Sequence, residues 1–192
     1  MVAGDNPISV DEYTYVNFTA TEGNGIKLIV NSASFTTTVD GETVALSLAA
    51  QTANTALYID WAGDGNVAQY LLGTTYNIFE ATTHAGVNVG VYTYEPTEKI
   101  TVFSMKGASL SNFDGTNLTA AKNINVSGAG LSSISLPENS TSLAELILDD
   151  NNFSSFDLTK YPALHLFSIN NNKLTELDLS QSTGLQIVSA SY

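Results

Sequence analysis

Apolar residues recur at a fixed spacing in the second half of the chain. The two clearest copies are LAELILDDNNFSSFDLTKYPA, residues 143–163, and LHLFSINNNKLTELDLSQSTG, residues 164–184. Their apolar positions coincide, and so do Asn151 and Asn172. The anchor position of the pattern falls at residues 103, 124, 146, 167 and 188, which are 21, 22, 21 and 21 residues apart. Such a fixed short period indicates a solenoid of stacked repeats.

Within each copy, apolar residues occupy every second position of a short x-L-x-L-x segment, as in residues 145–149. This alternation is typical of a short strand with one buried face. One such strand cannot bury its face alone, so stacked copies are expected to form a parallel sheet over a continuous core. The asparagines should face inward at a turn, where backbone groups of their own and the neighbouring turn satisfy the amides. In copies with alanine instead, at Ala108 and Ala129, the turn is expected to rely on glycine: Gly107, Gly128 and Gly130.

The two copies quoted above resemble the leucine-rich repeat L-x-x-L-x-L-x-x-N-x-L. In particular, they are similar to the short form ending in LTxLDLS that is common in Bacteroidetes-type surface proteins, and the best match to this ending is Leu-Thr-Glu-Leu-Asp-Leu-Ser at residues 174–180. Leu136, Asp157 and Leu158 retain parts of this ending, whereas Gly115 replaces the final leucine of the first copy. The resemblance implies a leucine-rich-repeat solenoid with short parallel strands over residues 98–192, in about 4.5 repeats of 21–22 residues.

The first half of the chain alternates with period two in short segments bounded by turn residues, which predicts strands. About seven strands in roughly ninety residues is the density expected of a β-sandwich. Asp40-Gly41 separates two of these segments, residues 35–39 and 43–48, and predicts a type I′ hairpin. The predicted fold class is therefore mainly β, with an N-terminal β-sandwich-like domain at residues 1–97 followed by the solenoid.

A second resemblance lies in residues 59–65, Ile-Asp-Trp-Ala-Gly-Asp-Gly. They look like the WDFGDG hairpin of PKD-type β-sandwich domains, with Ala62 inserted. Trp61, the sole tryptophan, is expected to be buried in that domain's core. Asp60 and Asp64, together with Asn66, could instead ligate calcium. Because only about five residues separate the last strand from the first repeat, the domain should abut the solenoid and act as its cap.

Composition narrows the classes of function. The 19 acidic residues outnumber the 6 lysines, no arginine occurs, and the net charge is -13, which argues against nucleic acid. No apolar run is long enough for membrane insertion. The chain lacks cysteine, which excludes disulfides, thiolate zinc sites and thiol catalysis. A surface rich in Thr and Asn suits an exported protein, extracellular or on the cell surface. Residues after Met1 do not form a positively charged, apolar-cored leader, so any signal peptide is expected to have been removed or to lie outside this sequence.

No catalytic constellation is recognisable. His84 falls in a predicted loop, and His165 at a variable repeat position where a surface residue is expected. A recurring aspartate, at Asp114, Asp157 and Asp178, is expected to have a structural or solvated role. No phosphate loop or metal-ligand cluster is visible. The protein is therefore expected not to be an enzyme and to have no cofactor.

The predicted surface for binding is the concave face of the repeats, where residues between the buried positions point outward. Small polar groups dominate this face, and three apolar side chains form a patch near its C-terminal side. Protein binding or adhesion is the predicted role; the alternatives are a carbohydrate-binding accessory of a glycan-uptake system and a structural spacer. The candidate residues are Lys106, Asn123, Asn125, Glu145, Ile147, Asp149, Leu166, Ser168, Asn170 and Ile187.

The last repeat stops after its strand and before its return half. Each repeat depends on its neighbour to cover its core, so Leu177, Leu179, Val188 and Ala190 are expected to have exposed edges. An unpaired strand edge also invites association. We therefore expect further repeats or a cap in the native protein, and either fraying from about Leu174 or end-to-end self-association in this chain.

Overall fold

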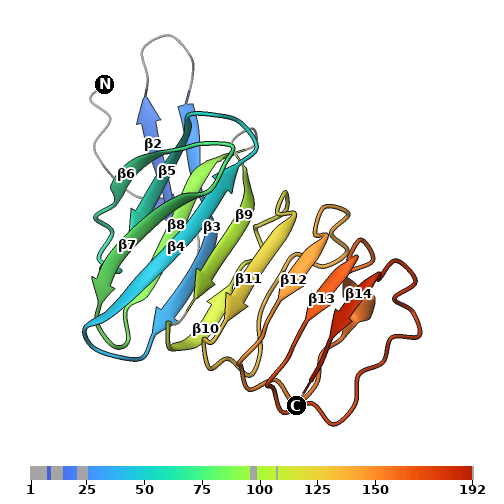
Figure 1. Cartoon of the computed structure of the whole chain (residues 1–192). Helices are drawn as coiled ribbons and strands as arrows, with labels where there is room; N and C mark the ends of the chain where they lie inside the picture. Colours follow the sequence, from blue (N-terminus) through green and yellow to red (C-terminus); the bar gives the residue numbers. More distant parts are fainter. Residues whose placement is uncertain (1–7, 10–14, 21–25, 96–98, 107, 192) are drawn as a thin grey trace.

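The computed structural model describes residues 8–9, 15–20, 26–95, 99–106 and 108–191. The fold is mainly β, with 42% of the residues in strands and almost no helix. The strands belong to two seven-stranded sheets. Figure 1 shows one of these sheets continuing from the N-terminal part into the stacked C-terminal strands. The helical content in the described residues is one 3-10 turn, η1 (Leu158–Lys160).

Sheet 2 contains the repeats. Its order is β14-β13-β12-β11-β9-β4-β7. The first five of these pair in parallel, and their anchor residues 103, 124, 146, 167 and 188 lie in one row. The predicted parallel register is thus confirmed, as a solenoid-like stack of about 4 turns over residues 102–189. The strands are β4 (Glu42–Ala50), β7 (Asn77–Thr83), β9 (Ile100–Lys106), β11 (Asn123–Ser127), β12 (Glu145–Ile147), β13 (Leu166–Ser168) and β14 (Ile187–Ser189).

Sheet 1 is antiparallel and has the order β1-β2-β3-β8-β5-β6, with β10 paired to β3. The last strand, β10, is the return half of the first repeat, so the solenoid contributes to both sheets. The members are β1 (Ile8–Ser9), β2 (Tyr15–Ala20), β3 (Ile26–Thr37), β5 (Thr55–Asp60), β6 (Ala68–Leu72), β8 (Asn88–Glu95) and β10 (Leu110–Asp114).

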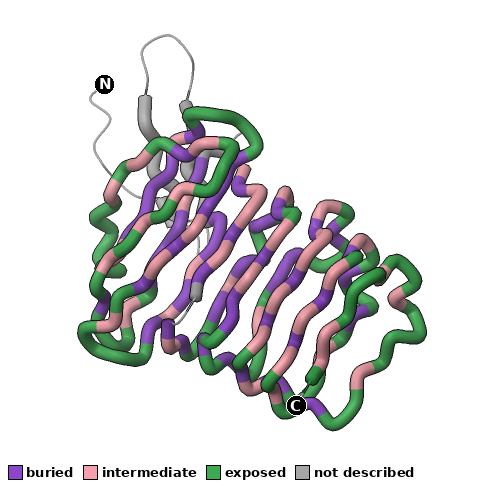
Figure 2. Tube along the Cα trace, viewed as in Figure 1, coloured by how far each residue is buried: buried purple, intermediate pink, exposed green. Residues whose placement is uncertain are grey.

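Each repeat consists of a strand and a return half, which together are called a coil. The first coil is covered by the N-terminal part of the chain. Strand β9 lies between β4, with which it is antiparallel, and β11, with which it is parallel. Phe103 and Met105 of β9 are consequently almost fully buried. One hydrophobic cluster extends from Ala33 to Leu174, and Figure 2 shows its buried positions alternating with half-buried ones along the strands.

The predicted hairpin at Asp40-Gly41 is wrong. Only Gly41 of the pair has a positive φ, at 73°, and the flanking strands β3 and β4 belong to different sheets. The turn residues determine where the chain bends. Which strands pair depends instead on which neighbours cover their apolar faces, and here β3 pairs with β8 while β4 pairs with β7.

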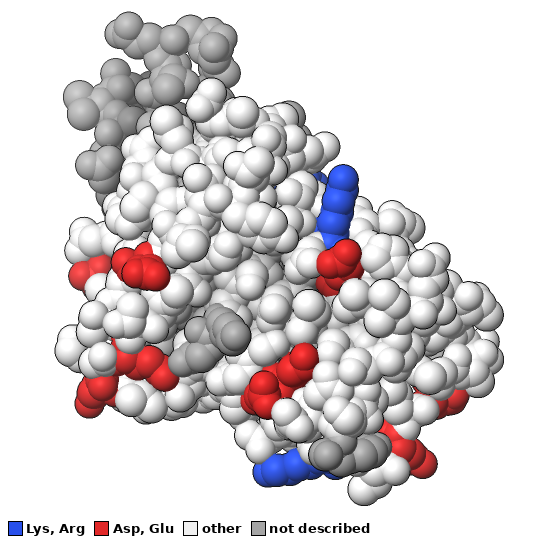
Figure 3. All heavy atoms as spheres, viewed as in Figure 1, with Lys and Arg blue, Asp and Glu red and all other residues white. Residues whose placement is uncertain are grey.

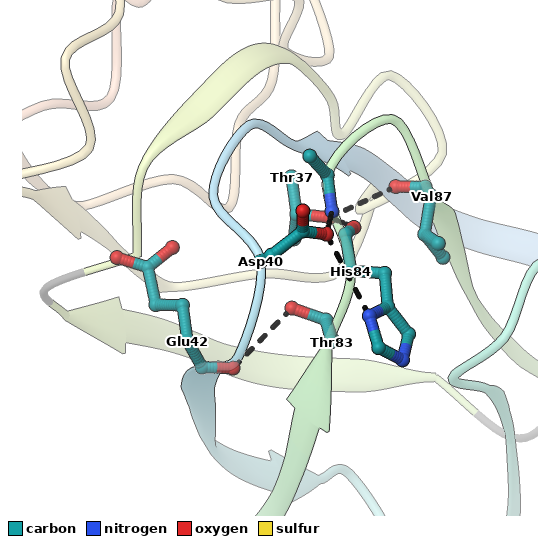
Figure 4. Close-up of polar contacts among 7 residues, drawn as sticks. Thr37, Asp40, Glu42, Thr83, His84 and Val87 are labelled. Carbon is teal, nitrogen blue, oxygen red and sulfur yellow. Dashed lines mark hydrogen bonds and ion pairs between the residues drawn. The ribbon is translucent and has the colours of Figure 1, made fainter.

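The segment between β3 and β4 therefore crosses from one sheet to the other, and it packs on the segment between β7 and β8, which crosses in the opposite direction (Figure 4). The Thr37 hydroxyl donates to the His84 carbonyl at 2.6 Å, and the Gly86 N–H donates to the Thr37 carbonyl at 2.7 Å. Asp40 Oδ1 accepts the Ala85 N–H at 2.9 Å. Backbone and side-chain hydrogen bonds thus hold the β3–β4 and β7–β8 segments together.

On its other side, the β3–β4 crossing contacts the first coil. The Thr38 N–H donates to the Ser109 carbonyl at 2.9 Å, and Glu42 Oε2 accepts the Ser109 N–H at 2.8 Å. In the next step along the stack, the Leu110 N–H donates to the Ala129 carbonyl at 2.9 Å. The crossing segments of the N-terminal part and the turns of the coils therefore form one column.

Asparagine continues this column in the later coils. Asn151 Oδ1 accepts the Leu131 N–H of the preceding coil at 2.9 Å. Its Nδ2 donates to the Val126 carbonyl of that coil at 2.8 Å and to the Leu148 carbonyl of its own coil at 3.0 Å. Asn172 makes the equivalent bonds one coil later. The predicted satisfaction of these amides by two adjacent turns is confirmed.

Three successive turns in the described part of the chain also contain a residue with left-handed backbone, in which most side chains are disfavoured. Gly128 (φ 70°), Asp150 (φ 56°) and Asn171 (φ 52°) occupy this position in successive coils. Gly130 has a positive φ as well, so the predicted reliance on glycine in this coil is confirmed. Gly107 lies outside the described residues.

Trp61 is half-buried, so the prediction of a buried tryptophan is wrong. It packs against the edge of the hydrophobic cluster, and its Nε1 donates to the Tyr70 hydroxyl at 3.2 Å. That bond keeps the polar edge of the indole near the surface. Asp60 is the buried member of the motif, with 5% exposure, because its carboxylate accepts the N–H groups of Gly63 and Gly65 at 2.7 and 2.8 Å.

We predict that Asn151→Ala lowers the free energy of unfolding by about 1–3 kcal/mol, because buried backbone groups in two coils lose their partner. Asn172→Ala should act in the same direction. Asn152→Ala is the matched control, since its side chain is only half-buried and Nδ2 makes a single bond, to the Gly130 carbonyl. Urea titration gives the comparison. Equal midpoints for Asn151→Ala and Asn152→Ala would contradict the proposed role.

Candidate binding surface

The outer face of sheet 2 is formed by the strand residues that alternate with buried core residues along each strand. In the repeats, it is the face that the sequence analysis calls concave. Their Cα partners lie in register from coil to coil, with neighbouring strands about 4.8 Å apart. This is the arrangement that the sequence predicts for the candidate residues. One row is Val102, Asn123, Glu145, Leu166 and Ile187, and the next is Ser104, Asn125, Ile147, Ser168 and Ser189.

The face also continues onto the N-terminal part, which the sequence reasoning missed. Ser47 of β4 pairs with Ser104 on one side and with Ile78 of β7 on the other. Ile78 is 68% exposed, and Tyr76, two residues earlier, is 62% exposed. The alternation of apolar and polar residues in β4 and β7 indicates which of their side chains face outward. The hairpin that was incorrectly predicted at Asp40-Gly41 gave β4 the wrong neighbour, so the extension of the face was not predicted.

The polar residues at the C-terminal end of the strands form a ladder between coils. Asp149 Oδ1 accepts the Ser168 hydroxyl at 2.7 Å and the Asn170 N–H at 2.7 Å. One coil later, Asn170 Oδ1 accepts the Ser189 hydroxyl at 2.8 Å and the Ser191 N–H at 2.9 Å. These candidate residues therefore hold adjacent coils together, which reduces the hydrogen bonds they can offer to a partner.

The remaining polar candidates are paired in a similar way. Asn123 Nδ2 donates to Glu145 Oε2 at 2.5 Å. Asn125 Oδ1 accepts the hydroxyl of Ser127 at 2.7 Å within its own coil. Lys106 lies beside Ser127 in the register, and its side chain is outside the described part of the structure.

The apolar candidates are less tightly grouped than predicted. Leu166 and Ile187 are direct neighbours on β13 and β14, and Ile187 is 57% exposed. Ile147 instead pairs with Ser168, so it lies diagonally from Leu166. Figure 3 shows that most atoms on the viewed side of the molecule belong to uncharged residues. The face therefore offers an apolar pair within a largely neutral surface.

The recurring aspartates have a structural role, as predicted. Asp157 Oδ1 accepts the N–H and the hydroxyl of Thr159 at 3.0 and 2.6 Å. Asp114 and Asp178 cap their return turns in the same manner. The hydrogen bonds from the Thr159 hydroxyl and N–H lower the pKa of the Asp157 carboxyl below its ordinary value.

Other possible sites lie away from this face. His84 is exposed and its Nδ1 is 3.6 Å from Asp40 Oδ1. Asp64, the other acidic calcium candidate, accepts the Asn66 N–H. Among the described residues, no three His, Cys, Asp or Glu side chains gather where they could hold a metal ion. The described helical segment is too short to span a membrane.

Comparison with protein-family models, with curated proteins and with solved structures finds no match for this chain. The geometry of the outer face is therefore the basis for a functional assignment.

The Asp149 ladder predicts that Asp149→Ala lowers the free energy of unfolding by about 1–2 kcal/mol. Asp149→Asn should retain most of the stability, because one side-chain oxygen, Oδ1, accepts all the bonds seen. Urea titration of both variants tests this. If Asn and Ala at this position are equally destabilising, the ladder does not hold the coils together.

The capping by Asp157 predicts a dependence on pH. Because the folded-state pKa of Asp157 is depressed, its contribution is present above the ordinary carboxyl pKa and is lost as the pH falls through the folded value. The difference in urea midpoint between the wild type and Asp157→Ala should be largest near neutral pH and shrink in acid. A difference that does not vary with pH would show that the charged cap contributes no stability.

Proposed function

We propose that the chain is a non-enzymatic binding protein that recognises a partner protein through the outer face of sheet 2. In this proposal the coils are leucine-rich repeats of the short surface-protein type. Residues 1–97 form a sandwich-like, PKD-like domain that caps them. The protein acts outside the cell or on its surface, as an adhesion or protein-interaction module.

The observation that carries the proposal is the Leu166 and Ile187 pair. Both side chains project from adjacent strands of a regular sheet, where a partner can cover them together. Ile187 is exposed and Leu166 is half-buried, and apolar neighbours that reach the protein surface favour an interaction site. The polar residues around them are already hydrogen-bonded within the sheet, so a partner can cover them at a small cost in desolvation.

The two exposed residues at the opposite edge of the face favour a second candidate, glycan binding. Sugar sites commonly use an exposed aromatic ring for stacking, and Tyr76 is 62% exposed beside Ile78. This position is far along the sheet from Leu166, because β4, β9, β11 and β12 lie between β7 and β13. The two candidate functions thus depend on different residues.

The proposal predicts that Leu166→Ser with Ile187→Ser weakens binding to the partner at least tenfold, because the apolar anchors are lost. The measurement is binding of the purified chain to a panel of immobilised extracellular-matrix proteins, in parallel with a glycan array. Leu71→Ser is the matched control, since Leu71 is 63% exposed on β6 of sheet 1.

Glycan signals that disappear with Tyr76→Ala and persist in the Leu166/Ile187 variant would instead establish the second candidate. Protein binding that is insensitive to the Leu166/Ile187 double substitution would exclude this end of the face as the site. Circular dichroism of each variant confirms that the fold is retained.

A further inference from the structure

A cleft lies between the return halves of three successive coils. Its volume is about 350 Å³, at the lower end of the range for small-molecule sites. The lining comes from Thr116 of the first coil, residues 134–138 of the second, and Lys160 and Tyr161 of the third. None of these residues belongs to a strand of sheet 2, so the cleft is separate from the outer face.

The second coil departs from the repeat where the cleft opens. The coils on either side have an aspartate that caps the return turn, at Asp114 and Asp157. The equivalent residue of the second coil is Ser135, and Pro137 replaces the threonine whose N–H the aspartate accepts. Because proline has no N–H and serine is shorter than aspartate, this coil lacks the cap. Space is left beside both residues, which line the cleft.

Hydrogen bonds fix the walls of the cleft. Towards the first coil, the Gly115 N–H donates to the Ser135 carbonyl at 2.8 Å, and the Ser135 N–H donates to the Phe113 carbonyl at 3.2 Å. Towards the third coil, the Asn139 N–H donates to the Lys160 carbonyl at 2.8 Å. Since the backbone is held on both sides, a ligand does not have to order it.

Tyr161 lines the cleft and has a hydroxyl without a partner. The residue is 7% exposed, at the repeat position that Leu118 occupies in the first coil. Its ring stacks on Phe156 with a centroid distance of 5.7 Å, whereas its hydroxyl makes no hydrogen bond to a described residue. Burial raises the pKa of this hydroxyl, on which Lys160 and Glu138 act in opposite directions. Buried polar groups normally have a hydrogen-bond partner, so the hydroxyl points to a ligand.

A charged donor and a charged acceptor stand side by side in the same cleft. Lys160 Nζ donates to Glu138 Oε1 at 2.7 Å, which leaves the other ammonium protons and Oε2 for a ligand. The pair has no net charge, and the net charge of the chain, -13, disfavours an anion. A sugar hydroxyl both donates and accepts. Neighbouring hydroxyls can therefore bond to the carboxylate and the ammonium together, while the C–H face of the ring packs on Ile134 and Pro137, which also line the cleft.

We propose that this cleft binds one neutral sugar residue, free or at the end of a glycan. Two neighbouring hydroxyls of the sugar bond to Glu138 and Lys160, and a third bonds to the Tyr161 hydroxyl. The site is independent of the proposed function. It also does not use Tyr76, the ring that favours glycan binding at the edge of sheet 2.

The test titrates the isotope-labelled full chain with glucose, galactose, mannose and N-acetylglucosamine and follows the amide signals by NMR. We expect at least one of these sugars to shift the Lys160 and Tyr161 amides in a saturable way. Tyr161→Phe should weaken that binding at least tenfold, because it removes only the hydroxyl and keeps the ring. Glu138→Gln should also weaken it, since the charged acceptor is lost. A glycan array separates free sugars from glycan ends.

Matched controls place the site. Tyr76→Ala and the Leu166/Ile187 double substitution should retain sugar binding, because neither touches the cleft. Tyr161→Phe should be at least as stable as the wild type in urea, since it removes a buried hydroxyl that has no partner in the described structure. A clear loss of stability in this variant would contradict the assignment of the hydroxyl to a ligand.

The remaining outcomes would overturn the proposal. They are absence of binding by every sugar and glycan, binding that Tyr161→Phe leaves unchanged, and binding that is lost with Tyr76→Ala. Inorganic phosphate and glucuronate are the charged probes. If either binds in the cleft more tightly than the neutral sugars, the site is an anion site instead.

Discussion

Every coil of this protein leaves a buried backbone N–H and one apolar face that only the next coil can cover. Asn151 and Asn172 meet the first requirement in later coils, and the Ala129 carbonyl meets it where alanine replaces asparagine. The row of anchor side chains meets the second. Because each requirement is satisfied by a neighbour, stability is shared along the stack. The same constraint makes the N-terminal part necessary for the first coil, where β4 and β3 pair with β9 and β10.

The constraint also shapes the surface that can bind a partner. Polar side chains on the outer face are used in part to join coils, as in the ladder from Asp149 through Asn170 to Ser191. Exposed apolar residues occur at both edges of sheet 2, at Ile78 on β7 and Ile187 on β14. A broad, regular and mostly neutral face favours recognition by shape and apolar contact over recognition by charge.

The sequence alone determined the repeat. The period, the parallel register, the inward asparagines and the glycine turn at Gly128 were all readable, whereas the recurring aspartates were expected only to be structural or solvated. Each of these features involves contacts between residues only one repeat apart in the sequence. Because the features also recur from copy to copy, each copy supports the interpretation of the others. The candidate face followed from the same alternation. The predicted candidates accordingly fall into its two rows, Asn123, Glu145, Leu166 and Ile187 in one and Asn125, Ile147 and Ser168 in the other.

Only the tertiary structure decided how the non-repeating half is paired. Asp40-Gly41 predicted a hairpin, yet β3 and β4 lie in different sheets, and the outer face consequently extends to β7. It also decided that Trp61 is half-buried while Asp60 is enclosed by backbone donors. Local alternation shows which side of a strand is apolar. It does not show which distant strand covers that side, because that choice depends on burial and hydrogen bonding summed over the whole sheet.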